Sequence, residues 1–335
     1  MSDNNIFTFR DLNNKYHFGE KGFAFFPLWH YTSTNGLVGI IRDDPAEHGK
    51  LHFWFTRSDC LNDTSEGAHI IDSYQQVCND LLKQGDISRE FFDCIKHCEI
   101  SSHQFINFPL PMSDDGVHNS MLDYVPCHAY ICSFSLKEDS LDMWRYYSKG
   151  NGGYGLKLTP FIFDYYKEYE YSEYDENAIF IKICSYKVIY DDSEKIEMLN
   201  RIILDTFIAY QNENIAEQEK ANNAKHFIQF GLKNFQFQFK HPCFASEQEY
   251  RFVVYLPYSK PRNLKNELPA IKHRVQNGIV VPYIDLVVEN GTSHLSDVLI
   301  SPYIENQNVL VTTSDYLSHC GFNCKTKLSQ LPVRE

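Results

Sequence analysis

Three strongly apolar runs lie far apart in this chain, and each borders a short polar motif. The runs are Phe23–Tyr31, Ala129–Phe134 and Tyr250–Leu256, and the motifs beside them read HYTS, CSFS and SEQEYR. Short apolar runs bounded by polar residues are typical of buried strands. We therefore expect the three strands to share one central region of a sheet, with the polar motifs at strand ends, where binding sites often lie.

The rest of the pattern predicts a mixed α+β fold. Apolar residues recur at helical intervals in Ala68–Gln84, in Ser88–Cys98 and from Ser193 to Tyr210, and Val309–His319 is the last expected helix. Since the chain has no repeat and no low-complexity linker, the simplest organisation is one α+β domain over residues 1–335, with helical insertions near residues 68–125 and 190–237. Further strands are expected at Leu51–Thr56, Tyr154–Leu158, Ile179–Tyr186, Gly278–Val281 and Val298–Ile300.

Charge and cysteine content limit what the chain binds and where it acts. A formal net charge of −13 disfavours indiscriminate binding to nucleic acid or to anionic membranes. The polar start of the chain lacks the features of an export signal, and the most apolar later run, Ile279–Val288, is too short to span a bilayer. The ten scattered cysteines then predict reduced structural thiols, no metal site and a cytoplasmic protein.

Two glutamates, Glu247 and Glu249, give the strongest chemical signal. Residues two apart on a strand share a face, so both carboxylates are expected to point into the same space. Two ionised carboxylates side by side are costly unless a cation arrives or one of them stays protonated. The structural alternative is an ion pair between Glu249 and Arg251, which follows on the same predicted face and would neutralise half of the pair.

Other polar residues mark the ends of the neighbouring strands. His30, with Tyr31 and Thr32 beside it, stands where a strand meets a short helix capped by the next residues. Ser133 and Ser135 share one face of their strand. No Gly-x-Ser-x-Gly motif surrounds either serine, which argues against a nucleophile.

Two further groups have both a structural and a functional interpretation. Trp144 and Tyr147 lie three residues apart on a predicted helical turn, where aromatic residues pack in cores more often than they stack on ligands. Asn62, Asp63 and Glu66 lie in a loop. Such residues either form turns and helix caps or bond a ligand.

The order of these motifs resembles that of ADP-ribosyltransferases, in which His or Arg, Ser-x-Ser, and Gln-x-Glu or Glu-x-Glu lie on successive strands. The segment LWHYTSTNGLVGII is also similar to the first motif of DNA-targeting ADP-ribosyltransferase toxins. More closely, the chain resembles a widespread bacterial family known mainly as a domain of unknown function. Its pattern is present as HYTS at His30, LNDTSE at Leu61, CSFS at Cys132, MWRYY at Met143, SEQEYR at Ser246 and SQLPVR at Ser329.

The resemblance to ADP-ribosyltransferases implies a split mixed sheet with helical insertions, and NAD as the substrate. Cleavage of the nicotinamide–ribose bond passes through an oxocarbenium-like cation, which a carboxylate stabilises. Glu249 would hold a ribose hydroxyl and stabilise this cation, Glu247 would act as general base, and His30 would bond a ribose. The other residues implied at the NAD site are Tyr31 or Tyr147 stacked on nicotinamide, Ser133 or Ser135 orienting the catalytic carboxylate, and Thr32, Asn62, Trp144 and Arg251 around the cleft.

This interpretation makes the protein an NAD-consuming mono-ADP-ribosyltransferase or NAD glycohydrolase. The resemblance further implies a toxin or antiphage defence effector with a regulatory partner, and a protein or nucleic-acid acceptor that the sequence does not identify. Two other classes stay open. A metal-dependent nuclease or hydrolase would use Asp63, Glu66, Glu247 and Glu249 as ligands. A non-catalytic nucleotide-sensing or protein-binding module would use the carboxylates only to order its core.

Overall fold

The chain forms two compact units. The computed structural model describes residues 7–16, 26–61, 68–98, 104–107, 124–148, 152–163, 182–258, 268–276 and 278–332. A helical unit comprises Met1–Glu20, Asn62–Gln104 and Val188–Ala245, and a sheet unit comprises Lys21–Leu61, Phe105–Lys187 and Ser246–Glu335. The regions expected as two separate helical insertions therefore contribute to one helical unit.

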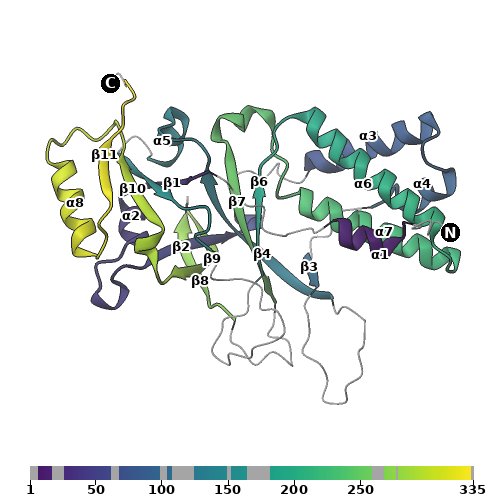
Figure 1. The fold of residues 1–335 in the computed structure, drawn as a ribbon, viewed down its shortest axis with the longest axis horizontal. Coiled ribbons are helices and arrows are strands. Elements are labelled where there is room, and N and C mark those ends of the chain that lie inside the picture. Colours follow the sequence, from purple (N-terminus) through teal and green to yellow (C-terminus); the bar gives the residue numbers. More distant parts are fainter. Residues whose placement is uncertain are drawn as a thin grey trace, which may run out of the picture. The chain divides into compact units, whose positions relative to one another are not determined.

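The helical unit is built from α-helices, drawn as coiled ribbons in Figure 1, and side chains cap two of them. Ser88 caps α4 and Asp191 caps α6, because each side chain accepts a hydrogen bond from the first turn. The polar stretch after Tyr210 interrupts the helix for only a few residues before α7 begins, and α6 packs against both α7 and α3. The helices of this unit are α1 (Phe9–Lys15), α3 (Ala68–Gln84), α4 (Arg89–Ile95), α6 (Asp192–Asn212) and α7 (Glu217–Phe235).

The sheet unit carries one large mixed sheet, in agreement with the expected α+β class. The described strands follow the order β11-β10-β5-β1-β4-β2-β9-β8, and β4 also pairs with β3 and with β7, which in turn pairs with β6. The pair β10 and β11 is parallel, which makes the sheet mixed. The strands are β1 (Leu28–Ser33), β2 (Leu51–Arg57), β3 (Gln104–Asn107), β4 (Tyr124–Ser135), β5 (Gly153–Leu158), β6 (Lys182–Lys187), β7 (Glu249–Pro257), β8 (Ile271–Gln276), β9 (Ile279–Val288), β10 (Leu295–Ile300) and β11 (Lys325–Leu328).

Short helices complete the sheet unit. Of the two residues expected to cap α2, Ser33 and Thr34, it is Ser33 that does so, by accepting a hydrogen bond from the amide of Gly36. The α-helices are α2 (Thr34–Ile40), α5 (Leu141–Tyr147) and α8 (Val309–His319), and the 3₁₀ turns are η1 (Pro45–Glu47), η2 (Ser58–Cys60), η4 (Pro242–Glu247) and η5 (Gly291–Ser293).

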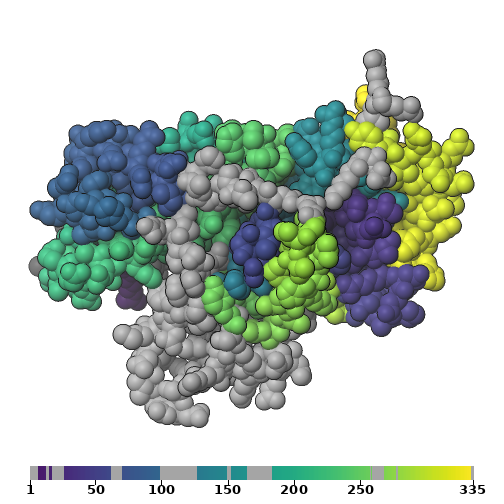
Figure 2. Space-filling model, turned by 180° about the vertical axis from the view of Figure 1, so that it is seen from behind, coloured from purple at the N-terminus to yellow at the C-terminus, as the bar shows by residue number. Residues whose placement is uncertain are grey.

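The prediction that the three apolar runs share one sheet region is confirmed. Trp29 of β1 pairs with Ser135 of β4, and Ser135 pairs with Glu249 of β7. Strands β1, β4 and β7 are therefore neighbours. Strands β8 and β11 were not expected from the sequence, because their side chains are mostly polar and exposed. The yellow-green β8–β9 hairpin is exposed on the face seen in Figure 2.

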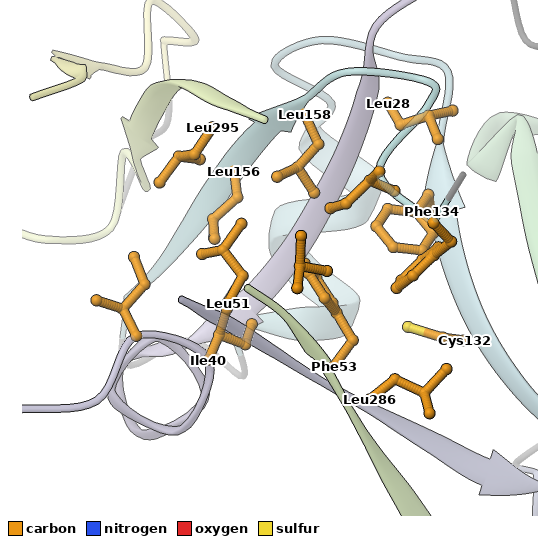
Figure 3. Packing of buried hydrophobic residues seen from close by; sticks show 14 of the residues in the cluster. Leu28, Ile40, Leu51, Phe53, Cys132, Phe134, Leu156, Leu158, Leu286 and Leu295 are labelled. Carbon is orange, nitrogen blue, oxygen red and sulfur yellow. The ribbon is translucent and has the colours of Figure 1, made fainter. Parts of the chain in front are cut away.

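One face of the sheet is apolar and buried. Phe53, Phe134, Leu156 and Leu286 come from four strands and pack together, as Figure 3 shows. Helices α2 and α8 add apolar residues to the same core. Since alternate residues of a strand point to opposite faces, the residues between these define a second face, which carries the polar motifs.

The second face is partly covered by α5. Trp29 and Tyr31 pack there with Met143, Trp144 and Leu299. A Cβ atom at Gly155, which pairs with Tyr31, would lie 3.3 Å from the Trp144 ring and 3.4 Å from the Tyr31 ring. The absence of a side chain at this position therefore lets the two rings approach the strand. No described helix is both long enough and apolar enough to cross a membrane.

Candidate active site

A small pocket opens on the second face of the sheet where β1, β4 and β7 meet. It encloses about 250 Å³ of empty space, including the part that is open to solvent. It is lined by Trp29, Tyr31, Ser133, Phe134, Met143, Tyr147, Glu247 and Glu249.

Glu249, which lines the pocket, forms a buried ion pair with Arg251. Arg251 donates from Nε to Oε1 of Glu249 over 2.8 Å and from Nη2 to Oε2 over 2.9 Å. The two side chains are 2% and 7% exposed. The guanidinium fork matches the two carboxylate oxygens, so the pair fixes the orientation of Glu249. The ion pair considered as the structural alternative is therefore present, although Glu249 still lines the pocket.

The second carboxylate, Glu247, reaches the pocket by a different route from the one predicted. It ends η4 and does not lie on β7, so the expectation that both glutamates share a strand is wrong. Between them Gln248 has a φ of 44°, in the left-handed region. Although Glu247 lies outside the strand, this turn brings its buried carboxylate to the same pocket as Glu249.

The end of β4 holds this turn in place. The Ser135 hydroxyl donates to the carbonyl of Glu247 over 2.6 Å and accepts from the amide of Lys137 over 3.1 Å. The amide of Leu136 donates to the carbonyl of Gln248 over 2.9 Å. Ser135 thus positions the backbone of Glu247 and does not orient Glu249 through its hydroxyl. Ser133, two residues earlier, lines the pocket, and its hydroxyl has no hydrogen-bond partner among the described residues.

Aromatic residues form the opposite wall. Tyr31 meets the Trp144 ring edge to face, with 4.8 Å between ring centroids, and its hydroxyl donates to the carbonyl of Lys137. Burial raises the pKa of the Tyr31 hydroxyl above its ordinary value, so it stays protonated. Tyr147 is 40% exposed and stands at the pocket, whereas Trp144 is fully buried. Trp144 is therefore part of the core that supports the wall, and it is not a stacking surface for a ligand.

His30 does not reach the pocket. Trp29 and Tyr31, its neighbours on β1, point to the pocket face, so His30 points to the apolar face. Its ring packs against the rings of Phe53 and Phe134, and its Nδ1 lies 3.1 Å from the carbonyl oxygen of Ser133. Burial lowers the pKa of His30 to about 4, so the ring is neutral near pH 7. The expectation that His30 and Glu249 line one cleft is not met, because strand alternation separates them.

Two more predicted residues do not line the pocket. Thr32 follows the same alternation as His30, and its hydroxyl lies under α2, where a Cβ at Gly36 would overlap it. Asn62 lies outside the described residues, as do Asp63 and Glu66. Among the residues that the structure describes, no three His, Cys, Asp or Glu side chains cluster as metal ligands.

The family comparison covers much of this site. Residues 143–252 match the family model described as "Protein of unknown function (DUF2971)". The match spans about a third of the 335 residues and confirms, for that segment, the expected resemblance to a domain of unknown function. It begins in α5 at Met143 and ends one residue after Arg251. Searches of curated proteins and of solved structures gave no match, so the resemblance to ADP-ribosyltransferases stays a prediction.

Residues outside the DUF2971 segment complete the same wall. Asp139, with a φ of 47°, accepts hydrogen bonds from Nε1 of Trp144, from the Ser329 hydroxyl and from the amide of Gln330. It thereby ties the SQLPVR motif to α5.

Sequence reasoning missed Asp139 as well as the lining residues Trp29 and Met143. The alternation of Trp29, His30 and Tyr31 was a usable signal for Trp29, because it places the two larger aromatic residues on one face.

Proposed function

We propose that this protein cleaves the nicotinamide–ribose bond of NAD at the glutamate pocket. The observation that carries the proposal is the meeting of two buried carboxylates, Glu247 and Glu249, with the Trp29 and Tyr31 side chains in one pocket. A flat cationic ring fits a pocket lined by carboxylates and aromatic groups, and the nicotinamide ring of NAD is such a cation.

The chemistry follows from the charge that develops on the ribose. When the C1′–N bond breaks, its electron pair leaves with nicotinamide, which becomes neutral, and C1′ becomes part of an oxocarbenium-like cation. Glu249, held by Arg251, stabilises this cation electrostatically. Glu247 then accepts a proton as water adds to C1′. If an acceptor hydroxyl or amine replaces water, the same step gives ADP-ribosylation.

In this proposal the nicotinamide end of NAD lies against the lining residues of the pocket, and the remainder of the dinucleotide lies outside. The hydroxyl of Ser133 faces the same space and serves as a hydrogen-bond partner for the ribose. An ADP-ribosyltransferase-like role for the β1, β4 and β7 region is part of this proposal. His30 is not part of it, since that side chain lies on the opposite face.

Nicotinamide release from NAD tests the proposal directly. The key variant is Glu249→Gln, because Gln keeps the shape of the side chain but loses the charge that stabilises the cation. We expect a loss of about 100- to 1,000-fold in rate, as for the removal of one preorganised electrostatic group. Glu289→Gln is the matched control, since its side chain is 63% exposed in the same unit. Release that is unchanged in Glu249→Gln contradicts the proposal.

A second variant separates the two carboxylates. Glu249→Gln should lose both hydrolysis and transfer, whereas Glu247→Gln should lose transfer to an acceptor more than hydrolysis, since water needs less help from a base. Because Glu249→Gln leaves Arg251 without its carboxylate, its unfolding midpoint must be measured alongside. Equal losses of both activities in the two variants would contradict this division of roles.

The buried ion pair favours a second candidate, a nucleotide-binding module without turnover. In that role Arg251 neutralises Glu249 permanently and the pair only orders the pocket. Binding of NAD without nicotinamide release would support this candidate. Both assays should be run with and without a chelator, because cleavage of nucleic acid that needs a divalent cation would point to the metal-dependent class.

A further inference from the structure

A half-buried arginine lies on the same face of the sheet as the glutamate pocket, without a carboxylate partner among the described residues. Arg274 of β8 uses Nη2 to donate to the Thr56 hydroxyl over 2.8 Å and to the Gln276 side-chain oxygen over 3.0 Å. Both partners are neutral. Its Nε–H and the two N–H groups of Nη1 have no hydrogen-bond partner in the described part of the chain. Burial also lowers the pKa of Arg274 somewhat, although arginine stays charged.

Two aromatic rings support this guanidinium. The Arg274 guanidinium carbon lies 5.1 Å from the centroid of the Trp54 ring and 5.4 Å from that of the Tyr283 ring. The two rings are themselves 5.0 Å apart, and Trp54 is 37% exposed. Stacking holds the planar guanidinium in one orientation, so less freedom is lost when it binds an anion. The exposed indole also offers a flat surface for a base.

The surroundings of Arg274 are positive in a strongly acidic chain. Arg42 and Lys272 both bind Asp285, over 2.6 Å and 3.0 Å, so two cations share one carboxylate. His52 lies 3.4 Å from Asp285 through Nδ1. Although burial acts to raise the pKa of Asp285, the hydrogen bonds from His52 and the two cations outweigh it and keep this carboxyl ionised. His52 also contacts Glu47, which pairs with Lys50, and Lys50 in turn pairs with Glu289. Counted with Arg274, four cations face three carboxylates, so a surplus of one formal positive charge remains.

The strand pairing relates this cluster to the glutamate pocket. Thr56, which Arg274 binds, pairs with Ile131 of β4, and Ile131 lies two residues along the strand from Ser133. Two residues of a strand span about 7 Å, and neighbouring strands lie about 4.8 Å apart. Ile131, Ser133 and Thr56 also share one face of the sheet. The yellow-green hairpin that carries Arg274 is exposed on the face seen in Figure 2.

We propose that Arg274, stacked on Trp54 and Tyr283, is a phosphate subsite that binds the diphosphate of a nucleotide. The free guanidinium donors bind phosphate oxygens, the positive surplus attracts them, and Trp54 faces the base or ribose. Assigning the diphosphate to NAD rests on the proposed function, since the nicotinamide end would then enter the glutamate pocket. Affinity for ADP does not rest on it, because ADP carries no nicotinamide.

Calorimetric titration with ADP and with inorganic pyrophosphate tests the subsite. We expect binding that weakens with added salt and falls about 10- to 100-fold in Arg274→Gln, the usual effect of losing charge-assisted hydrogen bonds. The ADP affinity of Arg274→Lys should lie between those of the native protein and Arg274→Gln, because Lys keeps the charge but lacks the stacked planar guanidinium. Arg201→Gln is the matched control, as this arginine is exposed on α6.

A second variant, at an exposed residue, keeps the test informative if Arg274→Gln does not fold. Lys272 is 50% exposed, so Lys272→Gln should keep the fold and weaken ADP binding by a smaller factor. Equal ADP affinity in Arg274→Gln and the native protein overturns the proposal, as does no binding at millimolar ADP. Binding of a single-stranded oligonucleotide without ADP binding also overturns it. ADP binding without NAD cleavage leaves the subsite standing and removes only the proposed activity.

Discussion

The two faces of the sheet are built by the same strands from different residues. On one face, β2, β4 and β9 carry Phe53, Phe134 and Leu286, all almost fully buried. On the other face, the residues adjacent to these in the sequence are Trp54, Ser133 and Asp285. The apolar face gains free energy from removing surface from water. The polar face needs a partner for each buried charge, since an unpaired charge is costly there.

This difference explains where ligands can act. On the apolar face even His30 is surrounded by rings and held neutral. On the polar face, Glu249 and Asp285 are paired with cations. Two carboxylates line the pocket at one place, and the Arg274 guanidinium lies at another place on the same face. Such an arrangement suits a ligand with a cationic and an anionic part. The following predictions test the contrast between the faces.

The largest effect is expected from Arg251 on the polar face. Arg251→Met removes the guanidinium and leaves the Glu249 carboxylate buried without its main partner, which should lower the free energy of unfolding by about 3–5 kcal/mol. Urea denaturation measures the loss. The double variant Glu249→Leu with Arg251→Met should be more stable than the single variant. A double variant that is less stable than Arg251→Met would show that the unpaired Glu249 carboxylate does not cause the loss of stability in Arg251→Met.

On the apolar face, the comparable test is a substitution that leaves a cavity in the core. Leu286 is 2% exposed, so Leu286→Ala should lower the free energy of unfolding by about 2–4 kcal/mol. Leu328 of β11 is 42% exposed, and Leu328→Ala is the control for the same substitution outside the core. Urea denaturation of both variants makes the comparison. Similar losses in the two variants would contradict a core confined to this face.

His30 should make the stability of the apolar face depend on pH. Its pKa of about 4 in the folded chain lies below the ordinary 6.5, so the unfolded chain takes up a proton first as the pH falls. Its contribution is therefore complete above pH 6.5 and decreases toward pH 4, by about 2 kcal/mol between pH 7 and pH 5. His30→Phe should remove this part of the pH dependence in denaturation curves. If the free energy of unfolding depends on pH in the same way in His30→Phe and the native protein, His30 is not held neutral in the folded chain.

The smallest effect compares two serines on one strand of the polar face. Ser135→Ala removes a buried hydroxyl that bonds Glu247 and Lys137, and should cost about 1–2 kcal/mol. Ser133→Ala should leave stability nearly unchanged and weaken NAD binding, because this hydroxyl faces the pocket. Thermal unfolding and NAD titration separate the two outcomes. Equal destabilisation by both changes would contradict the assignment of Ser135 to the Glu247 turn.

Local patterns in the sequence determined most of the strands and most of the helices. Helix α8 matches its predicted bounds, and one of the two expected capping residues, Ser33, caps α2, because periodicity and capping depend on neighbours in the chain. The motifs at Tyr31, Ser133 and Glu249 also pointed to one sheet region. Strands β8 and β11 could not be recognised, since edge strands with polar, exposed residues lack an apolar signal.

Only the tertiary structure decided which of these residues meet. The pairing of Trp29 with Ser135 and of Ser135 with Glu249 puts Tyr31 at the pocket and His30 on the other face. The left-handed turn at Gln248 brings Glu247 to the pocket from outside the strand. Likewise, Arg274 meets Trp54 and Tyr283 only because β8, β9 and β2 are neighbours. Register, turn geometry and strand order depend on contacts between distant segments, which no local pattern contains.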